Sequence, residues 1–361
     1  MRVKLEDVCE RGTSSLMQKD IVDKNGKYPV YGASGRIGSM ETYQQEHQTV
    51  AVVKDGAGIG RTMLLPEKSS VIGTMQYLIP KNCIESEYLY YVVKYMHLEK
   101  YFSGATIPHI YFRDYKTEEF NLHDKTEQRE IVSTLKRIEA IISNRQEQLT
   151  KLDELVKARF VEMFGGYAPN AKLSDVASIT GGLTKNSNRN IMKLKLPYLR
   201  VANVSYAKID VSEMLEIGLT EDERAKTLLS YDDLLFVEGN GSPDQIGRVA
   251  LWKNEITPCV HQNHLIKARF NSHLIVPYFA LHYFMSREGR EQIQGKAVST
   301  SGLYTLSVSK ISNLLIPTPP LSLQNQFADF VAEVDKSKVE VQKALDQTQL
   351  LFDSLMQQYF G

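Results

Sequence analysis

The second half of this 361-residue chain repeats the first half, and this repeat constrains the fold more than any other feature. Five short motifs recur in the same order, and the offset between the copies never falls along the chain, as insertions into the second copy would require. The motifs are Lys4–Val8 with Lys172–Val176 (offset 168), Val52–Gly56 with Phe236–Gly241 (about 184), Ile59–Arg61 with Ile246–Arg248 (187), Leu78–Ile79 with Leu265–Ile266 (187), and Phe164–Gly165 with Phe360–Gly361 (196). Five ordered matches are hard to obtain by chance. We therefore predict two copies of one folding unit.

Each copy ends in a long segment without Gly or Pro, at 126–163 and at 322–359. These segments are rich in helix-forming residues, and their apolar residues are spaced alternately by four and three, the pattern of a coiled-coil seam. The predicted seam residues are Ile131, Leu135, Ile138, Ile142, Leu149, Leu152, Val156 and Met163 in the first helix, and Phe327, Val331, Val334, Val341, Leu345, Phe352 and Leu355 in the second. An alternative is two amphipathic helices that lie on separate cores, but a seam this narrow favours helix–helix pairing.

The segments before the helices predict small mixed domains with many short strands. Gln48–Val53 and Leu234–Val237 are typical of buried strands that run into Gly-rich turns, and short helices are expected at Glu87–Tyr101 and Val276–Gln294. The predicted fold class is α+β: two similar mixed α/β domains joined by two long helices that form an antiparallel coiled coil, with a pseudo-twofold internal repeat. The predicted boundaries are 1–125 for the first domain, 126–165 for the first helix, 166–321 for the second domain and 322–361 for the second helix.

Composition excludes several classes of protein. No run of 18 or more apolar residues occurs, and the N-terminal residues lack the apolar core of a signal peptide. The three cysteines are too few and too scattered for a disulfide framework, so we expect a cytoplasmic protein. Lys and Arg together number 43, as do Asp and Glu, and this zero net charge counts against a tight, autonomous nucleic-acid binder. The span 176–209, which holds basic residues and no acidic one, is an exception.

The sequence offers no convincing active site. Phe236–Gly241 superficially resembles the Gly-rich loop of S-adenosylmethionine-dependent methyltransferases, but a strand-like stretch follows it where a helix should begin. Gly56–Gly60 has the wrong spacing for a dinucleotide or phosphate-binding loop. Cys259, His261 and His264 lack a fourth zinc ligand at a suitable spacing. We expect no catalytic residue and no metal site.

Two similar domains joined by two long helices suggest a protein that holds two binding domains at a fixed distance. From 131 to 163 the first helix rises roughly 48 Å at 1.5 Å per residue, the length of roughly 14 base pairs of DNA. If the helices pair antiparallel, the domains are expected at opposite ends, and each would read one half of a split DNA site. Gly361 would then lie near Met1, which makes the arrangement quasi-cyclic.

Motifs along the whole chain point to one family. The stretches are Lys4–Val8, Tyr28–Gly35, Gly58–Arg61 and Tyr88–Tyr91 in the first copy, and Lys172–Val176, Leu196–Val201, Ile246–Arg248 and Pro317–Leu321 followed by Gln324 in the second. With these motifs in this order, the chain resembles the specificity subunit of type I restriction–modification systems. One departure is Phe120–Lys125, which lacks the Pro-rich stretch that precedes the second helix.

That resemblance implies two target-recognition domains that bind double-stranded DNA, held apart by two spacer helices. It also implies partners: adenine methyltransferase subunits, expected to number two, and restriction subunits that translocate and cut DNA. S-adenosylmethionine, ATP and Mg²⁺ are expected on those partner subunits, and this chain is expected to carry no cofactor. Because the partners would supply much of the attraction to phosphate, we predict weak DNA binding by the chain alone.

Basic, amide and aromatic side chains in the predicted turns are the candidate DNA contacts, because they pair with guanine, adenine and phosphate. They are Tyr31, Arg36, Lys54, Arg61, His109 and Arg113 in the first domain, and Lys185, Arg189, Lys193, Asn240, Arg248, His261 and Tyr304 in the second. For each residue the alternative is a solvated charge or a turn residue. Two alternative functions remain open: a coiled-coil scaffold for proteins, and the recognition subunit of a related bipartite restriction enzyme.

Overall fold

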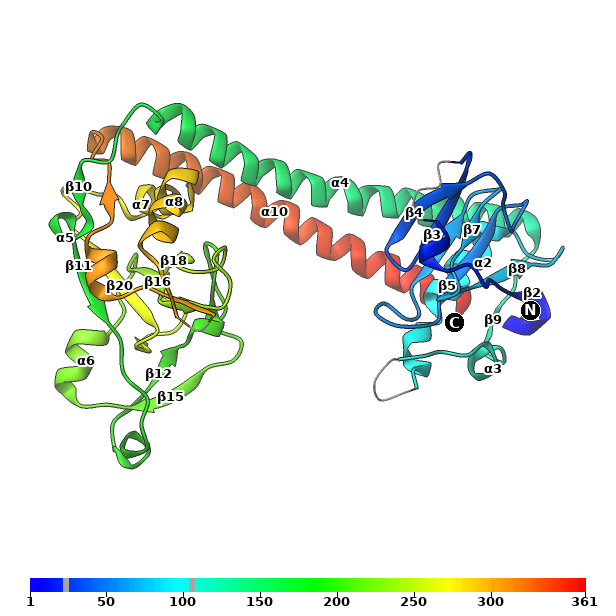
Figure 1. The fold of residues 1–361 in the computed structure, drawn as a ribbon, viewed down its shortest axis with the longest axis horizontal. Coiled ribbons are helices and arrows are strands. Elements are labelled where there is room, and N and C mark those ends of the chain that lie inside the picture. The colour runs from blue at the N-terminus through cyan, green and yellow to red at the C-terminus, as the bar shows by residue number, and fades with distance from the viewer. Residues whose placement is uncertain (22–25, 104–107, 301) are drawn as a thin grey trace. The chain divides into compact units, whose positions relative to one another are not determined.

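The structure, a computed structural model, describes residues 1–21, 26–103, 108–300 and 302–361. They form two compact units, called here unit 1 (Met1–Gln148 with Val341–Gly361) and unit 2 (Leu149–Glu340). The division crosses the two longest helices, α4 (Lys125–Phe164) and α10 (Leu321–Phe360). Each unit therefore contains a globular part and one stretch of each helix, which are coloured green and orange to red in Figure 1.

The globular part of unit 1 has two small sheets. One has four antiparallel strands in the order β2–β8–β5–β6, and the other has the order β4–β3–β7, with β3 and β7 parallel. A separate pair, β1 with β9, joins the start of the chain to the segment before α4. The elements are β1 (Arg2–Lys4), α1 (Leu5–Val8), β2 (Cys9–Thr13), η1 (Gln18–Asp20), β3 (Tyr28–Gly32), β4 (Gly35–Met40), β5 (Thr49–Val53), β6 (Thr62–Leu65), β7 (Ser70–Val71), β8 (Met75–Pro80), α2 (Ser86–Tyr95), η2 (Leu98–Tyr101), α3 (Phe112–Tyr115) and β9 (Glu119–Asn121).

The globular part of unit 2 repeats this arrangement and adds to it. Its four-stranded sheet has the order β11–β20–β16–β18, its three-stranded sheet has the order β15–β12–β19 with β12 and β19 parallel, and β10 pairs with β23. The additions include the pair β13–β14, the sheet β17–β22–β21 and helix α6. The elements are β10 (Ala171–Lys172), α5 (Leu173–Val176), β11 (Ala177–Gly181), η3 (Ser187–Ile191), β12 (Lys195–Leu199), η4 (Val201–Asn203), β13 (Val204–Ser205), β14 (Lys208–Ile209), β15 (Leu215–Gly218), α6 (Glu221–Thr227), β16 (Leu234–Val237), β17 (Gly239–Asn240), β18 (Val249–Leu251), β19 (Val260–His261), β20 (Leu265–Phe270), α7 (Pro277–Met285), α8 (Arg287–Lys296), β21 (Val298–Thr300), β22 (Leu303–Thr305), α9 (Val308–Ser312) and β23 (Leu315–Ile316).

The shared strand order confirms the predicted repeat and corrects one of its five matches. Val50 of β5 pairs with Leu78, and the corresponding Leu234 of β16 pairs with Ala268. Leu78 therefore corresponds to Ala268, and the predicted match of Leu78–Ile79 to Leu265–Ile266 is wrong by three residues. An apolar dipeptide carries too little information to set a strand register.

The recurring Ile-Gly-Arg motif closes the same loop in both units. In unit 1 the Val53 amide donates to the Arg61 carbonyl and the Gly60 amide donates to the Val53 carbonyl, both at 2.9 Å. In unit 2 Val237 makes the same two bonds with Arg248 and Gly247, at 2.9 and 3.0 Å. Gly60 and Gly247 have φ of 80° and 63°, a left-handed conformation that favours glycine. The glycine therefore recurs because the loop closure requires it, whereas the arginine contributes only its backbone carbonyl to these bonds.

The two long helices pair antiparallel, since the beginning of each shares a core with the end of the other. In unit 1 Ile131 and Leu135 of α4 belong to one buried cluster with Phe352 and Phe360 of α10. In unit 2 Val156, Phe160 and Phe164 of α4 belong to one cluster with Phe327 and Val331 of α10. Because each cluster contains residues of both helices, the alternative of two helices on separate cores is not what the structure shows. Both clusters also include residues of the globular parts.

The predicted seam residues are all buried or half-buried. The buried ones are Ile131, Leu135, Ile138, Val156, Phe327, Val331, Val334 and Phe352, and the half-buried ones are Ile142, Leu149, Leu152, Met163, Val341, Leu345 and Leu355. A second buried set, Val132, Phe160, Phe164, Met356 and Phe360, was not predicted. It widens the apolar stripe because each helix also packs against a globular part.

A buried glutamine ties the first turn of each long helix to a neighbouring helix. The Gln128 side chain accepts from the Glu85 amide at 2.9 Å and donates to the Cys83 and His123 carbonyls. Gln324, 196 residues later, makes the equivalent three bonds, with the Val276 amide and the Leu274 and Pro319 carbonyls. Glu85 and Val276 are the N-caps of α2 and α7, so each glutamine fixes where such a helix begins.

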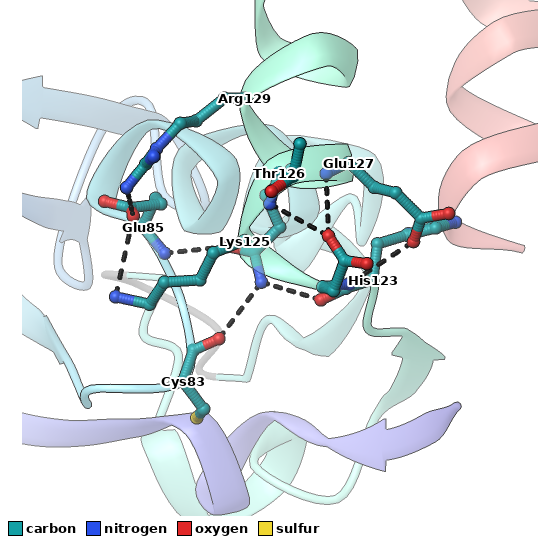
Figure 2. Close-up of polar contacts among 9 residues, drawn as sticks. Cys83, Glu85, His123, Lys125, Thr126, Glu127 and Arg129 are labelled. Carbon is teal, nitrogen blue, oxygen red and sulfur yellow. Dashed lines mark hydrogen bonds and ion pairs between the residues drawn. The ribbon is translucent and has the colours of Figure 1, made fainter.

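Figure 2 shows how α4 begins without the Pro-rich stretch that precedes α10. The Asp124 carboxylate accepts from the Thr126 and Glu127 amides at 2.9 Å, which caps the helix. Glu85 lies beside Arg129 and Lys125, at 3.0 and 3.5 Å, and the hydrogen bond from Arg129 is the largest cause that lowers the Glu85 pKa.

The two short helices predicted at Glu87–Tyr101 and Val276–Gln294 are each interrupted. His97, with φ of 50°, separates α2 from η2, and Ser286 separates α7 from α8 by capping the latter. Within the described ranges, no helix is both long and apolar enough to cross a membrane.

Candidate nucleic-acid interface

In unit 1 most of the predicted contact residues gather around the loop 54–61 that follows β5. The Lys54 amide donates to Thr74, and the Lys54 carbonyl accepts from Ile110 at 2.9 Å. The Gly56 amide donates to the Pro108 carbonyl. These backbone bonds bring the segment 108–113, with His109 and Arg113, against the loop, and we call this group the unit 1 loop cluster.

The Asp55 carboxylate contacts two of the predicted residues of this cluster. Asp55 accepts from His109 Nδ1 at 2.7 Å and pairs with Lys54 Nζ at 3.5 Å. The His109 ring stacks on Tyr111, and the Arg113 guanidinium lies 4.7 Å from the centre of that Tyr111 ring. Lys54, His109 and Arg113 therefore lie in one connected polar surface, as hydrogen-bond donors to DNA would need to.

The hairpin β3–β4 joins the same surface through Arg61. Arg61 Nη1 donates to the Ala33 carbonyl, in the hairpin turn, at 2.8 Å. Tyr31 and Arg36 are cross-strand partners on either side of that turn, where Arg36 is exposed and Tyr31 half-buried. Their roles as DNA contacts stay predictions.

Unit 2 has an equivalent group, the unit 2 loop cluster, around the loop 238–248. The Glu238 amide donates to His264, and the Glu238 carbonyl accepts from Leu306 at 2.7 Å, as Lys54 does with its neighbours in unit 1. The Glu238 carboxylate accepts from His264 Nδ1 at 3.0 Å. Asn240 is the ladder partner of Tyr304, so these two predicted residues lie side by side.

Arg248 lies at the end of this loop and is half-buried. Its Nη1 donates to the Gln245 side chain at 3.2 Å, while its buried Nε has no partner among the described residues. Like the roles of Asn240 and Tyr304, its role as a DNA contact stays a prediction.

Arg189 is a correction to the predicted set, because it is buried and fully engaged within the protein. Its guanidinium donates to the Thr184 and Gly218 carbonyls and forms a two-pronged pair with Glu223, at 3.1 and 2.8 Å. A side chain held in this way is not available to phosphate or base edges. Sequence could not separate it from the neighbouring Lys185 and Lys193, which are exposed as predicted contacts must be.

His261 is the second correction, since none of its surface is exposed. Its Nδ1 lies 2.9 Å from the Leu265 carbonyl, and burial, followed by the nearby charge of Lys267, lowers its pKa to about 4. The strand ladders place His261 where unit 1 has the buried Val71. It is a neutral core residue and not a DNA contact.

The two carboxylates at the centre of the clusters, Asp55 and Glu238, were missed because basic residues were sought. Glu238 directly follows β16, and Asp55 lies two residues after the end of β5; both strands are fully buried. That position was the available signal, because polar residues at the end of a buried strand are where a fold presents functional groups.

The described residues contain no group of three or more His, Cys, Asp or Glu side chains placed to hold a metal ion. Burial raises the pKa of Cys259 to about 12, so its thiol is protonated at neutral pH.

Each unit also carries a groove at the same place, between the end of its α2 or α7 and the two long helices. The unit 1 groove has a volume of about 1200 Å³ and the unit 2 groove about 860 Å³. Ten lining positions correspond through the repeat: Lys94 with Met285, Tyr95 with Ser286, Met96 with Arg287, Glu139 with Asp335, Ile142 with Lys338, Gln349 with Asp153, Phe352 with Val156, Asp353 with Lys157, Met356 with Phe160 and Gln357 with Val161.

Comparisons with known proteins agree with this organisation. Residues 1–153 and 169–348 match the family described as "Type I restriction modification DNA specificity domain". The chain is 26% identical over 183 residues to the type I restriction enzyme StySPI specificity subunit of Salmonella potsdam, covering 50% of this chain and 39% of that protein. It is 22% identical over 283 residues to the EcoKI specificity subunit of Escherichia coli, covering 72% and 60%. The alignments thus span less than two thirds of these relatives.

Two solved structures share the fold along the whole chain. The S subunit of a type I restriction–modification system from M. genitalium has a TM-score of 0.59 at 16% identity, covering 100% of this chain and 96% of that one. A structure concerned with complex assembly and conformational transition of the type I R-M system also has a TM-score of 0.59, at 15% identity, covering 99% and 97%. At these identities the likeness shows the fold alone.

Proposed function

We infer the function of this chain from the family to which it belongs, that of the type I restriction modification DNA specificity domain. We propose that it is the DNA sequence-specificity subunit of a type I restriction–modification complex. Each globular part reads one half of a split DNA target, and partner subunits carry out adenine methylation or restriction.

One observation carries this proposal: the same scaffold presents a polar loop cluster twice, with different side chains. Backbone bonds of the same kind surround Lys54 in unit 1 and Glu238 in unit 2. The side chains at corresponding positions differ, since Lys54 in one stands where Glu238 stands in the other, and the two carboxylate–histidine pairs, Asp55 with His109 and Glu238 with His264, come from different positions of the repeat. A fixed scaffold with variable loops suits a protein that reads two different half-sites.

We propose that the chain has no catalytic activity of its own. S-adenosylmethionine, ATP and Mg²⁺ would then be bound by the partner subunits, which supply the chemistry. What this chain contributes is placement, because its antiparallel helices are of fixed length and each is tied to a globular part by a buried glutamine.

The paired grooves support two copies of one partner. Because the same helix positions line both, a subunit that docks in one groove has a site at the corresponding place in the other, although side chains differ there, as at Asp353 and Lys157. We propose that two adenine methyltransferase subunits bind the chain, and that restriction subunits join the complex they form. In symmetric oligomers the same surface makes the same contact in every copy, and a surface that repeats within one chain can likewise bind two copies of one partner.

The test is a map of N6-methyladenine in host DNA with and without this gene. The expected result is loss of methylation at one split motif, two short halves around a fixed gap of roughly 5–8 base pairs, as the helix spacing suggests. Unchanged methylation in a strain that demonstrably expresses the methyltransferase would favour a protein scaffold. The subunits that co-purify would distinguish a type I complex from a related bipartite restriction enzyme.

A further inference from the structure

The segment Thr184–Lys193, which joins β11 to β12 in unit 2, is fixed at both ends. At one end the Leu183 amide donates to the His261 carbonyl at 2.9 Å, and the Leu183 carbonyl accepts from Asn263 at 3.0 Å. At the other end the Leu194 carbonyl accepts from Leu219 at 3.1 Å. We call this segment the Arg189 loop.

The middle of the loop is held by Arg189, whose side chain points back into unit 2. Its Nη1 donates to the Gly218 carbonyl at 2.8 Å and its Nε to Thr184 at 2.5 Å, while Glu223 of α6 receives both ends of the guanidinium. The hydrogen bond from Arg189 is the largest cause that lowers the Glu223 pKa, so the carboxylate stays charged. A Cβ on Gly218 would lie 2.0 Å from the Arg189 carbonyl oxygen, so the loop backbone packs directly on β15.

This anchoring presents an apolar side chain to solvent. Ile191 is 86% exposed, and it follows Asn188 and Asn190, which are exposed as well. Because Ile191 is exposed, its side chain adds no burial energy to folding. The short helix η3 that carries it is nevertheless held in place by four hydrogen bonds that Arg189 donates. An isoleucine held outward on an anchored loop is available to contact a partner.

The charges around the loop favour a polyanionic partner. Lys185 and Lys193 flank the tip, both exposed, and the described residues include no ion-pair partner for either. The span 176–209 contains no Asp or Glu. Acidic residues reach the loop from the first turn of α6, where Glu223 is paired with Arg189 and Glu221 with Arg224. Figure 1 shows this green segment projecting from the end of unit 2 that lies away from α7 and α8.

The loop is continuous with the unit 2 loop cluster. Its first anchor contacts the turn 261–263, and the next residue, His264, pairs with Glu238. The loop therefore extends the surface to which the proposed function assigns the second half-site.

The corresponding loop of unit 1 has the same length and different chemistry. Tyr31 corresponds to Leu199 through the parallel ladders, at the same offset of 168 as the start of the repeat. At this offset Ile21, which is buried in a cluster with Val30, takes the place of Arg189, and Asp20 takes the place of Asn188; the counterpart of Ile191 lies outside the described residues. Equal length with changed chemistry is what two readers of different half-sites require.

We propose that the Arg189 loop is a base-reading element for the half-site of unit 2, an inference that rests on the proposed function. Ile191 makes the apolar contact with a base edge, such as a thymine methyl, and Asn188 and Asn190 hydrogen-bond neighbouring bases. Lys185 and Lys193 contact the flanking phosphates. Arg189 touches no DNA and is a positioning residue.

The test compares Ile191→Ser with Leu274→Ser, a matched change of another exposed apolar residue of unit 2. Each variant replaces the native gene in the host, and methylation is mapped as before. Ile191→Ser is expected to lower discrimination about tenfold at one or two positions of one half-site only, the size of one base contact. Leu274→Ser is expected to leave the motif unchanged, and both variants are expected to melt as the unchanged chain does, because neither side chain is buried.

The outcomes separate the inference from the proposed function. Ile191→Ser with an unchanged motif would overturn the inference alone, whereas absence of any gene-dependent split motif in the unaltered strain would overturn the proposed function. Uniform loss of methylation together with loss of co-purifying subunits would show that Ile191 contacts a protein, which also overturns the inference. A photo-crosslinking residue at position 191 of the purified complex gives a second measurement: cross-links to bases of one half-site are expected, and their absence contradicts the inference.

Discussion

Single buried side chains at the helix beginnings and loop closures determine how each unit is held together. Gln324 has no exposed surface and satisfies three backbone groups at once. Removing such a side chain leaves buried backbone donors and acceptors unpaired, and this lowers the free energy of unfolding by more than the loss of an exposed hydrogen bond does. The same position in unit 1 is Gln128, so this arrangement belongs to the fold and not to one target half-site.

Gln324→Leu is expected to lower the free energy of unfolding by about 1–3 kcal/mol, because the Val276 amide and two carbonyls lose their partner. Urea denaturation of the full chain measures this. The matched control is Gln326→Leu, two residues away and exposed, for which a change within about 0.5 kcal/mol is expected. Equal losses for the two variants would contradict the role of the buried side chain.

Gly247→Ala is expected to destabilise the chain by about 2–3 kcal/mol, since the residue has φ of 63° and an added Cβ would lie 2.3 Å from Ile293 Cγ2. Gly295→Ala serves as the control, because this glycine lies in α8 with open space around it. Alanine there should stabilise the helix by up to about 1 kcal/mol. Thermal unfolding of both variants gives the comparison, and a harmless Gly247→Ala would be inconsistent with the loop closure described.

His261 predicts a pH dependence. Burial lowers its pKa from 6.5 to about 4 in the folded chain, so the unfolded chain takes up a proton first as the pH falls. Its contribution to stability is present above pH 6.5 and is lost between pH 6.5 and 4, by up to about 3 kcal/mol. In urea titrations across this range, His261→Gln is expected to show a shallower loss than the unchanged chain, while His264→Gln, an exposed change, keeps the full slope.

At the scale of elements, the long helices serve two surfaces at once. One side of each helix packs in the seam and against a globular part, and another side lines a groove. The seam was predictable because its spacing repeats every seven residues, whereas the groove was not. Its walls come from α2 and α7 as well as the helices, and such long-range packing leaves no periodic signal in the sequence.

Tryptophan placed in one groove is expected to remove one of two bound methyltransferase subunits. Gln357→Trp blocks the groove of unit 1 and Val161→Trp the equivalent position in unit 2, and both residues are exposed. Native mass spectrometry of the co-purified complex should show one bound copy for each variant. Val339→Trp, on α10 outside the grooves, is the control and should retain both copies. Two copies in all three variants would exclude the grooves as the binding surfaces.

Which polar residues are exposed and which are buried could not be predicted from the sequence, for a related reason. Arg189 and Lys185 are indistinguishable in a basic stretch of sequence, and only Gly218 and Glu223, distant along the chain, determine that the arginine points inward. His261 likewise looked functional because a polar residue stood in an apolar strand. The repeat, the buried strands and the helices could be predicted since they depend on local pattern, but burial of a single polar side chain depends on tertiary partners.

At the scale of the whole molecule, the chain ends meet within unit 1. The Gly361 carbonyl accepts from Asn121 Nδ2 at 2.6 Å and from Arg2 Nη1 at 3.2 Å, and the Met1 amino group donates to the Leu122 carbonyl. The predicted proximity of Gly361 and Met1 is therefore confirmed. Gly361, which follows α10, therefore lies next to the start of the first copy, just as Gly165, which follows α4, leads into the start of the second copy.

A circular permutant is expected to fold and to direct methylation to the same motif. It joins Gly361 to Met1 through a linker of about four Gly and Ser residues and opens the chain between Gly165 and Gly166, which are both exposed. The methylation map of a strain that carries the permuted gene tests this. A second permutant, opened inside the buried β5 between Val50 and Ala51, should fail to accumulate. Failure of the first permutant together with normal folding of the second would contradict the closure described.

The equivalence of Gln128 and Gln324 has a consequence for inheritance. Each half ends in a long helix whose first turn is attached in the same way, so a gene exchange within a helix segment transfers one complete globular part together with its attachment. A lineage that carries several such genes can thereby combine old halves into new pairs, wherever the seam residues of the joined helices still pack together. New targets would then arise by recombination between genes in a single step, faster than by point mutation of the loops.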